Sequence, residues 1–92
     1  MNLQVRLNEG DRRYELLSDD GELIGLIDYR LTDSLIDLFH AETNPAHGGK
    51  GYGSMLAQGA LDDIRARGLT VRPSCPFIAD YLDKHPEYQD LL

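Results

Sequence analysis

The chain has 92 residues and a formal net charge of −7, from 16 acidic and 9 basic side chains. This length and an apolar content of 41% fit one folded domain and exclude a disordered acidic tail. The acidic balance argues against nucleic acid or an anionic membrane as partner, because both require clustered lysine and arginine.

The first half of the sequence is typical of four short strands joined by turns. Apolar and polar residues alternate from Leu3 to Leu7, which indicates a half-buried strand. Further strands are expected over residues 14–17, 22–29 and 35–42, with turns at 8–11 and 18–21. Connections this short join antiparallel neighbours, so the sequence predicts a meander.

The second half changes character after Asn44-Pro45. Small and apolar residues at spacings of three and four predict a helix over residues 51–67. Its expected inner face consists of Tyr52, Met55, Leu56, Gly59, Ala60 and Ile64. A short strand over 69–71, a helix over 76–84 and a last turn from Pro86 follow. The predicted fold class is α+β: a mainly antiparallel sheet, a crossover helix to one further strand, and a C-terminal helix, all in one domain spanning residues 1–92.

Charge is distributed unevenly along the chain. Residues 1–46 carry a net charge of −6, whereas residues 47–92 carry −1. Residues 43–61 and 64–79 contain no acid, and the second window contains Arg65, Arg67 and Arg72. We expect the two windows to form a connected region that accepts an anion; the alternative is chance clustering.

Four of the nine glycines fall within residues 48–53, between a predicted strand and a predicted helix. Glycines let backbone N–H groups approach a ligand, and a helix N-terminus favours phosphate. The alternative is a flexible loop without a ligand. A P-loop would need glycine at Asn44, and a dinucleotide fingerprint would need glycine at Ser54 or Leu56, so neither motif is present.

The remaining pattern, Gly48-x-x-Gly51-x-Gly53, resembles the pyrophosphate loop Arg/Gln-x-x-Gly-x-Gly/Ala of the GNAT superfamily of N-acetyltransferases. The chain departs from that loop at Gly48, where the pattern usually has Arg or Gln. Residues 75–77 (Cys-Pro-Phe) and 85–88 (His-Pro-Glu-Tyr) resemble the small stand-alone branch of predicted acetyltransferases. The specific resemblance covers residues 35–92.

The resemblance implies acetyl-CoA as co-substrate, bound in a cleft between the fourth and fifth strands. The pantetheine arm would pair with the fourth strand, and the pyrophosphate would lie on the glycine loop. The cofactor-binding residues that it implies are Ala41, Glu42, Thr43, Gly48, Gly49, Lys50, Gly51, Tyr52, Gly53, Ser54 and, as an acid for the thiolate, Tyr81.

His40 and Cys75 are the candidate catalytic residues. His40 and Glu42 lie two apart on one strand, so they share a face and form a candidate base site. Cys75 lies at a predicted helix start, where a thiolate is favoured. Two routes stay open: direct transfer with His40 taking the amine proton, or a first transfer to Cys75. The structural alternatives are a packed cysteine, a histidine at the sheet edge and, for Tyr81, a core residue.

Larger GNAT enzymes insert two helices between their first two strands to wall the acceptor site, whereas a short turn follows Leu7 here. We therefore expect an acetyl-CoA-dependent N-acetyltransferase for an unidentified amine, either on a macromolecule or in a site completed by a second subunit. The main alternative is a non-catalytic acyl-CoA-binding or partner-regulating module. A third is an interaction domain without a cofactor.

The cellular setting is predicted from cysteine content and targeting signals. Cys75 is a lone cysteine, so it forms no disulfide within the chain. The sequence has no run of about 20 apolar residues for a membrane helix and no apolar segment of a signal peptide at its start. We expect a cytoplasmic protein that is a monomer or a small homo-oligomer.

Overall fold

The computed structural model describes residues 2–47 and 51–92. Its sheet has five strands in chain order: β1 (Leu3–Asn8), β2 (Arg13–Ser18), β3 (Leu23–Thr32), β4 (Leu35–Thr43) and β5 (Thr70–Arg72). The helices are η1 (Pro45–His47), α1 (Tyr52–Ala66), α2 (Pro76–Lys84) and η2 (Pro86–Leu91).

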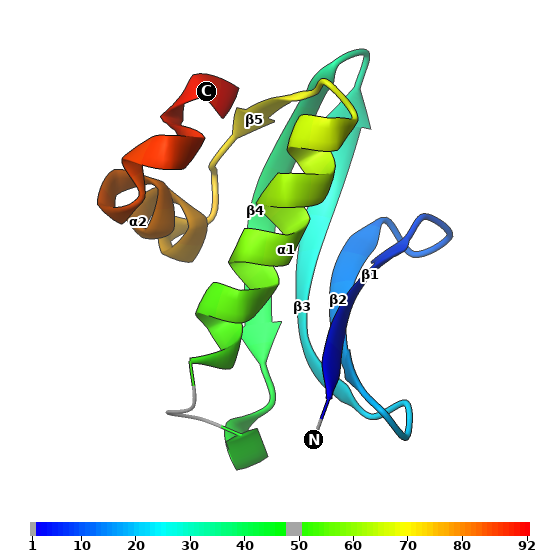
Figure 1. Cartoon of the computed structure of the whole chain (residues 1–92). Coiled ribbons are helices and arrows are strands. Elements are labelled where there is room, and N and C mark those ends of the chain that lie inside the picture. Colours follow the sequence, from blue (N-terminus) through cyan, green and yellow to red (C-terminus); the bar gives the residue numbers. More distant parts are fainter. Residues whose placement is uncertain (1, 48–50) are drawn as a thin grey trace.

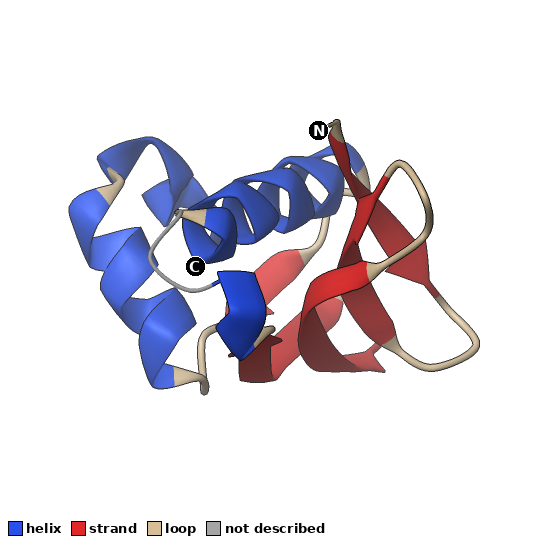
Figure 2. Ribbon diagram, turned by 90° about the horizontal axis from the view of Figure 1, so that it is seen from below, coloured by secondary structure: helices blue, strands red, loops and turns tan. Residues whose placement is uncertain are grey.

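The first four strands pair antiparallel, and α1 crosses over so that β5 pairs parallel to β4. Figure 1 shows α1 along one face of the sheet, with α2 and η2 on the β5 side. Seen from below in Figure 2, the helices gather to one side and the strands to the other. The predicted α+β class and crossover helix are confirmed.

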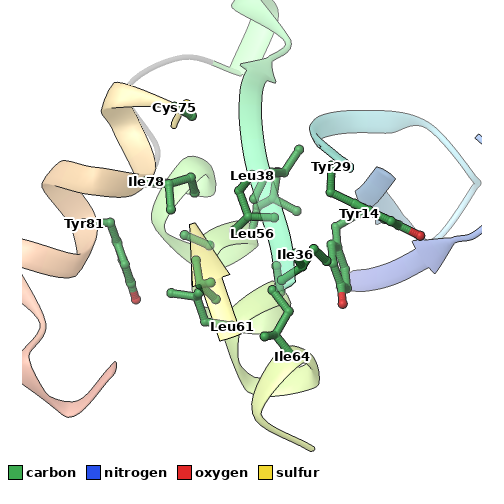
Figure 3. Close-up of a cluster of buried hydrophobic side chains, with 14 of the residues drawn as sticks. Tyr14, Tyr29, Ile36, Leu38, Leu56, Leu61, Ile64, Cys75, Ile78 and Tyr81 are labelled. Atoms are coloured by element: carbon green, nitrogen blue, oxygen red, sulfur yellow. The ribbon is translucent and has the colours of Figure 1, made fainter. Parts of the chain in front are cut away.

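A single apolar core fills the space between the sheet and the helices (Figure 3). The large side chains that are almost fully buried come from β2, β3, β4, α1 and α2: Tyr14, Leu16, Ile24, Ile27, Ile36, Leu38, Leu56, Leu61, Ile64, Ile78 and Leu82. Because these residues belong to elements that are distant in sequence, the core holds the meander and the C-terminal half together.

The inner face of α1 differs from the predicted one at its first turn. Leu56, Ala60 and Ile64 are buried as expected, and Ala57 and Leu61 complete the stripe. Met55 is 42% exposed, so its predicted inward placement is wrong. The reason is the helical period: at about 100° per residue, Met55 lies outside the stripe that Leu56 and Ala57 begin.

Two hydroxyl–carboxylate hydrogen bonds fasten α1 on opposite sides. Tyr14 Oη donates to Asp63 Oδ2 at 2.7 Å from β2, and Tyr88 Oη donates to Asp62 Oδ1 at 2.7 Å from η2. Burial, together with the neighbouring carboxylate, raises the pKa of both tyrosines, so both hydroxyls keep their protons as donors. The helix is thereby held against β2 and η2 at once.

A β-bulge changes the register midway along β4. Tyr29 pairs with Leu38, but Asp28 pairs with His40, so Phe39 is the extra residue. The Arg30 guanidinium carbon lies 4.4 Å from the centre of the Phe39 ring. A bulge bends its strand and re-aims the side chains that follow. Beyond it, Ala41 pairs with the buried Ile27 on the α1 face, while His40 pairs with Asp28 on the opposite face.

Gly59 of α1 lies so close to β1 that there is no room for a side chain. A Cβ on Gly59 would lie 2.5 Å from Val5 Cγ2 and 2.7 Å from Val5 Cβ. We expect Gly59→Ala to lower the free energy of unfolding by about 1–3 kcal/mol through overpacking, although alanine favours helices by about 1 kcal/mol. Urea unfolding measures this change.

The matched control is Gln58→Ala on the exposed side of α1, which should change stability little. Adding Val5→Ala to Gly59→Ala should recover part of the loss. A stabilising effect of Gly59→Ala alone would show that α1 does not approach β1 so closely.

Candidate active site between β4 and the start of α1

The cleft originates where β5 separates from β4. The two strands pair only over Leu35–Asp37 and Thr70–Arg72. Beyond Arg72 the chain reaches Pro73, which has no N–H to continue the ladder. The Cys75 N–H then donates to the Leu38 carbonyl at 2.8 Å and turns the chain into α2. The cleft of about 360 Å³ that opens next is lined by Ala41, Glu42, Thr43, His47, Gly51, Tyr52, Gly53, Ser54, Leu56 and Phe77.

The end of β4 turns backbone groups towards this open side. The Asn44 N–H donates to the Ile24 carbonyl of β3 at 2.7 Å. In an antiparallel pair, backbone groups alternate between the two sides of a strand. Residues 42 and 44 therefore face β3, whereas the N–H and C=O groups of Ala41 and Thr43 point away from it. On β3, the Tyr29 N–H donates to the carbonyl of Arg12, just before β2, at 3.0 Å, so the neighbouring Asp28 faces β4, in agreement with this alternation.

The start of α1 supplies the opposite wall. Gly51 is the N-cap, with a φ of +74° that favours glycine, and no side chain caps the helix. The Met55 N–H donates to the Gly51 carbonyl at 3.2 Å. The amides of Tyr52, Gly53 and Ser54 occupy the first turn, where N–H groups have no partner within the helix. This turn carries no acidic residue. The predicted loop residues Gly48, Gly49 and Lys50 lie outside the described residues.

His47 and Glu42 are the lining residues whose side chains contact other ionisable groups. His47 Nε2 lies 3.3 Å from Glu22 Oε2, and its ring centre lies 5.9 Å from that of Tyr52. Glu42 is the one acid among the described lining residues, and its Oε2 contacts His40 Nε2 at 3.0 Å. Its charge is therefore held on the far side of β4 from α1.

The candidate base site lies on the sheet face turned away from α1. The side chains of His40 and Glu42 are 49% and 64% exposed, and Asp28 lies directly across from His40. Glu15 shares this face, where Arg13 Nε donates to its carboxylate at 2.7 Å. Burial alone would raise the pKa of Glu15, but the hydrogen bonds from Arg13 and Asn8 outweigh it and lower that pKa. Glu15 is thus a fixed structural anion, whereas His40 and Glu42 are open to solvent.

Cys75 is the N-cap of α2, as its sequence position suggests, and is 5% exposed. In Figure 3 its side chain lies near Ile78, on the α2 side of the core. The backbone of Cys75 contacts Leu38, two residues before His40 on β4. Cys75 therefore lies beside the edge of β4 at Leu38, whereas His40 belongs to β4 itself and lies on its outer face.

The structure does not place Tyr81 among the residues that line the cleft. Its side chain is 7% exposed, and its ring stacks on that of His85 with 3.8 Å between centres. Burial raises the pKa of Tyr81, with smaller contributions from Glu87 and Asp62. The placement agrees with the alternative of a core residue.

The arginines of the acid-free windows do not join the cleft. Arg67 Nε bonds Asp63 at 2.7 Å, and Arg65 bonds Asp90 at 2.5 Å. Both lie at the end of α1, whose 15 residues span about 22 Å from the cleft. The expectation of one connected anion-accepting region is therefore wrong for them, because the helix carries them to the opposite end of the molecule.

Three lining residues, His47, Leu56 and Phe77, were not predicted as site residues. Leu56 was assigned to the core, and Phe77 belonged only to a resemblance of sequence. Within residues 2–47 and 51–92, no three His, Cys, Asp or Glu side chains gather as a metal site would require. No helix in the same part of the chain is both long and apolar enough to cross a bilayer.

Several solved structures share this architecture. A GCN5-like putative N-acetyltransferase from Staphylococcus aureus superposes with a TM-score of 0.73 at 26% identity, covering 98% of this chain and 87% of that one. The ribosomal-protein-S18-alanine N-acetyltransferase from Escherichia coli gives 0.64 at 18% identity, covering 82% of this chain. A GCN5-related N-acetyltransferase from Sphaerobacter thermophilus gives 0.55 at 21% identity, covering 86% of this chain. This chain spans 52% and 29% of the length of the latter two.

Sequence comparison gives the family. Comparison with curated proteins finds no significant match. The family model described as GCN5-related N-acetyl-transferase matches residues 13–91, which include β2 to β5, both α-helices and every described residue of the cleft. The chain therefore belongs to the GCN5-related N-acetyltransferase family.

Proposed function

We propose that this protein is an acetyl-CoA-dependent N-acetyltransferase that moves the acetyl group to an amine. The observation that carries the proposal is the cleft, where the outward-turned backbone of β4 faces the uncapped, acid-free start of α1. One wall suits an extended amide-containing chain and the other suits a diphosphate, and coenzyme A contains both.

The donor is held mainly by backbone groups. The diphosphate binds the first-turn amides of Tyr52, Gly53 and Ser54, together with the preceding glycine loop. The pantetheine arm lies along β4 and pairs with Ala41 and Thr43 as an added strand would. Glu42 contributes its backbone position, because its carboxylate is engaged by His40.

His40 is the proposed base for the acceptor. Its neutral imidazole, oriented by Glu42 at 3.0 Å, takes the proton that the amine loses when the new C–N bond forms, directly or through one water. The departing thiolate takes up a proton in turn. Cys75 is 5% exposed. We therefore favour direct transfer over a route through Cys75.

The acceptor approaches an open surface. The β1–β2 connection is a short turn in which the Asp11 N–H donates to Asn8 Oδ1 at 3.1 Å, so no inserted helices wall this side. A small amine would have little to contact there, which favours a macromolecular amine or a site completed by a second subunit. We propose that the protein acts in the cytoplasm as a monomer or small homo-oligomer.

The same open side favours one alternative, a non-catalytic acyl-CoA-binding or partner-regulating module. Gly48 also favours this alternative, because the GNAT pyrophosphate loop usually has Arg or Gln at that position. Such a module would bind acetyl-CoA without transferring the acetyl group at any pH.

Binding of acetyl-CoA is the first prediction of this proposal. At a free concentration about 100 times its dissociation constant, the ligand should add about 2.7 kcal/mol to the free energy of unfolding. For a domain of this size, each kcal/mol raises the melting temperature by about 4–8 °C. Thermal unfolding with and without acetyl-CoA measures the shift. No shift would favour an interaction domain without a cofactor.

Thr43→Pro tests whether the ligand occupies the proposed cleft. Proline removes the Thr43 N–H, which points away from β3, so the sheet should stay folded while the shift with acetyl-CoA falls. Glu42→Pro is the contrasting variant, because it removes an N–H that pairs with β3 and should destabilise the sheet itself. An unchanged ligand shift in a folded Thr43→Pro protein would place binding elsewhere.

Transfer is tested with His40→Ala and Cys75→Ser, by following thiol release from acetyl-CoA with lysine and short peptides as acceptors. We expect His40→Ala to lower kcat by about 10²–10⁴-fold, the usual contribution of a general base. Cys75→Ser should keep its activity, and mass spectrometry of the unaltered protein should show no acyl adduct. An acyl group trapped on the introduced serine of the Cys75→Ser variant would establish the two-step route instead.

A further inference from the structure

The first turn of α2 is fastened to β4 at its start. The Cys75 N–H donates to the Leu38 carbonyl at 2.8 Å, and the Ala79 N–H donates back to the Cys75 carbonyl at 3.0 Å. Pro76 occupies the first helical position, where its fixed φ suits the helix and its missing N–H costs nothing. The position of residue 77 relative to β4 is thus set by hydrogen bonds on either side of it.

A second contact joins this turn to α1. A Cβ on Gly53 would lie 3.0 Å from Phe77 Cζ, so the Phe77 ring rests directly on the Gly53 backbone. Gly53 has no positive φ to explain a glycine. The contact with Phe77 is therefore one physical reason for glycine at position 53. The close approach of a ligand would be a second, separate reason.

The Phe77 ring is nevertheless 40% exposed. It lines the cleft beside Gly53, and Leu56 is the buried apolar residue of the same lining. An aromatic side chain that rests on a helix backbone but stays uncovered in a concave site is typical of a ligand-binding surface. The exposed Phe77 ring therefore lies next to the first-turn amides of α1. Along the chain it follows Cys75, whose N–H contacts β4.

We propose that Phe77 is the residue that recognises the pantoate part of coenzyme A, an inference that rests on the proposed function. Pantoate is the group that follows the diphosphate, and its quaternary carbon carries two methyl groups. With the diphosphate on the amides of Tyr52, Gly53 and Ser54, those methyl groups lie against the exposed side of the Phe77 ring. Phe77 thus distinguishes coenzyme A from its nucleotide half, which has no apolar group at this place.

The experiment measures dissociation constants by calorimetry for coenzyme A and for 3′-phosphoadenosine 5′-diphosphate, its nucleotide half. Phe77→Ala should weaken coenzyme A binding by about tenfold, the effect of losing a modest apolar contact. Binding of the nucleotide half should not change. Phe77→Leu, which keeps an apolar side chain, should restore most of the affinity.

Met55→Ala is the matched control, because Met55 is 42% exposed on the same turn of α1 but does not line the cleft. It should leave both dissociation constants unchanged, and urea unfolding should show both variants folded. Equal losses for both ligands in Phe77→Ala would mean that Phe77 acts only through the helix start, and this would overturn the inference. So would unchanged coenzyme A binding. If the unaltered chain binds neither ligand, the proposed function itself fails.

Discussion

The pairing of β5 with β4 over only three residues is the constraint on which the site depends. A longer ladder would occupy the backbone groups of Ala41 and Thr43 and close the cleft. Pro73 ends the ladder, and the hydrogen bond from Cys75 to Leu38 directs the chain into α2 instead. The sheet therefore keeps one stretch of unused edge, enclosed by the starts of two helices.

Successive side chains of β4 point to opposite faces of the sheet, and this separates the proposed donor side from the proposed base. Ala41 lies on the face towards α1, and His40 lies on the opposite face with Glu42. The bulge at Phe39 decides which face each residue takes, because Phe39 is an extra residue with no partner on β3. Under the proposed function, donor and acceptor therefore meet from two sides of a single strand.

Much of the fold could be predicted from local patterns. Leu3 to Leu7 alternates, α1 ends at Ala66 within a residue of the predicted end, and Pro76 begins α2, as the sequence indicates. These signals are local because they depend on backbone conformation or on a helical or strand period. Met55 was misplaced because periodicity gives the spacing of a buried stripe but not its edges.

The site was less predictable, because it depends on long-range packing. The cleft edge of β4 followed from a resemblance to a family, whereas Phe77 became a candidate only when its contact with Gly53 was visible. Arg65 and Arg67 looked available in the sequence, yet Asp90 and Asp63 pair with them at the far end of α1. Charge counted along a chain does not show which charges are already paired.

The most direct measurement of the central claim is amide hydrogen exchange at single residues with and without coenzyme A. Ligand binding should slow exchange at Ala41 and Thr43, whose N–H groups point away from β3 on the open side of β4. Exchange at Glu42 and Asn44, whose N–H groups already face β3, should change little. Exchange at Ala41 and Thr43 that stays the same at saturating coenzyme A would contradict the account, because the ligand would then bind without the free edge of β4.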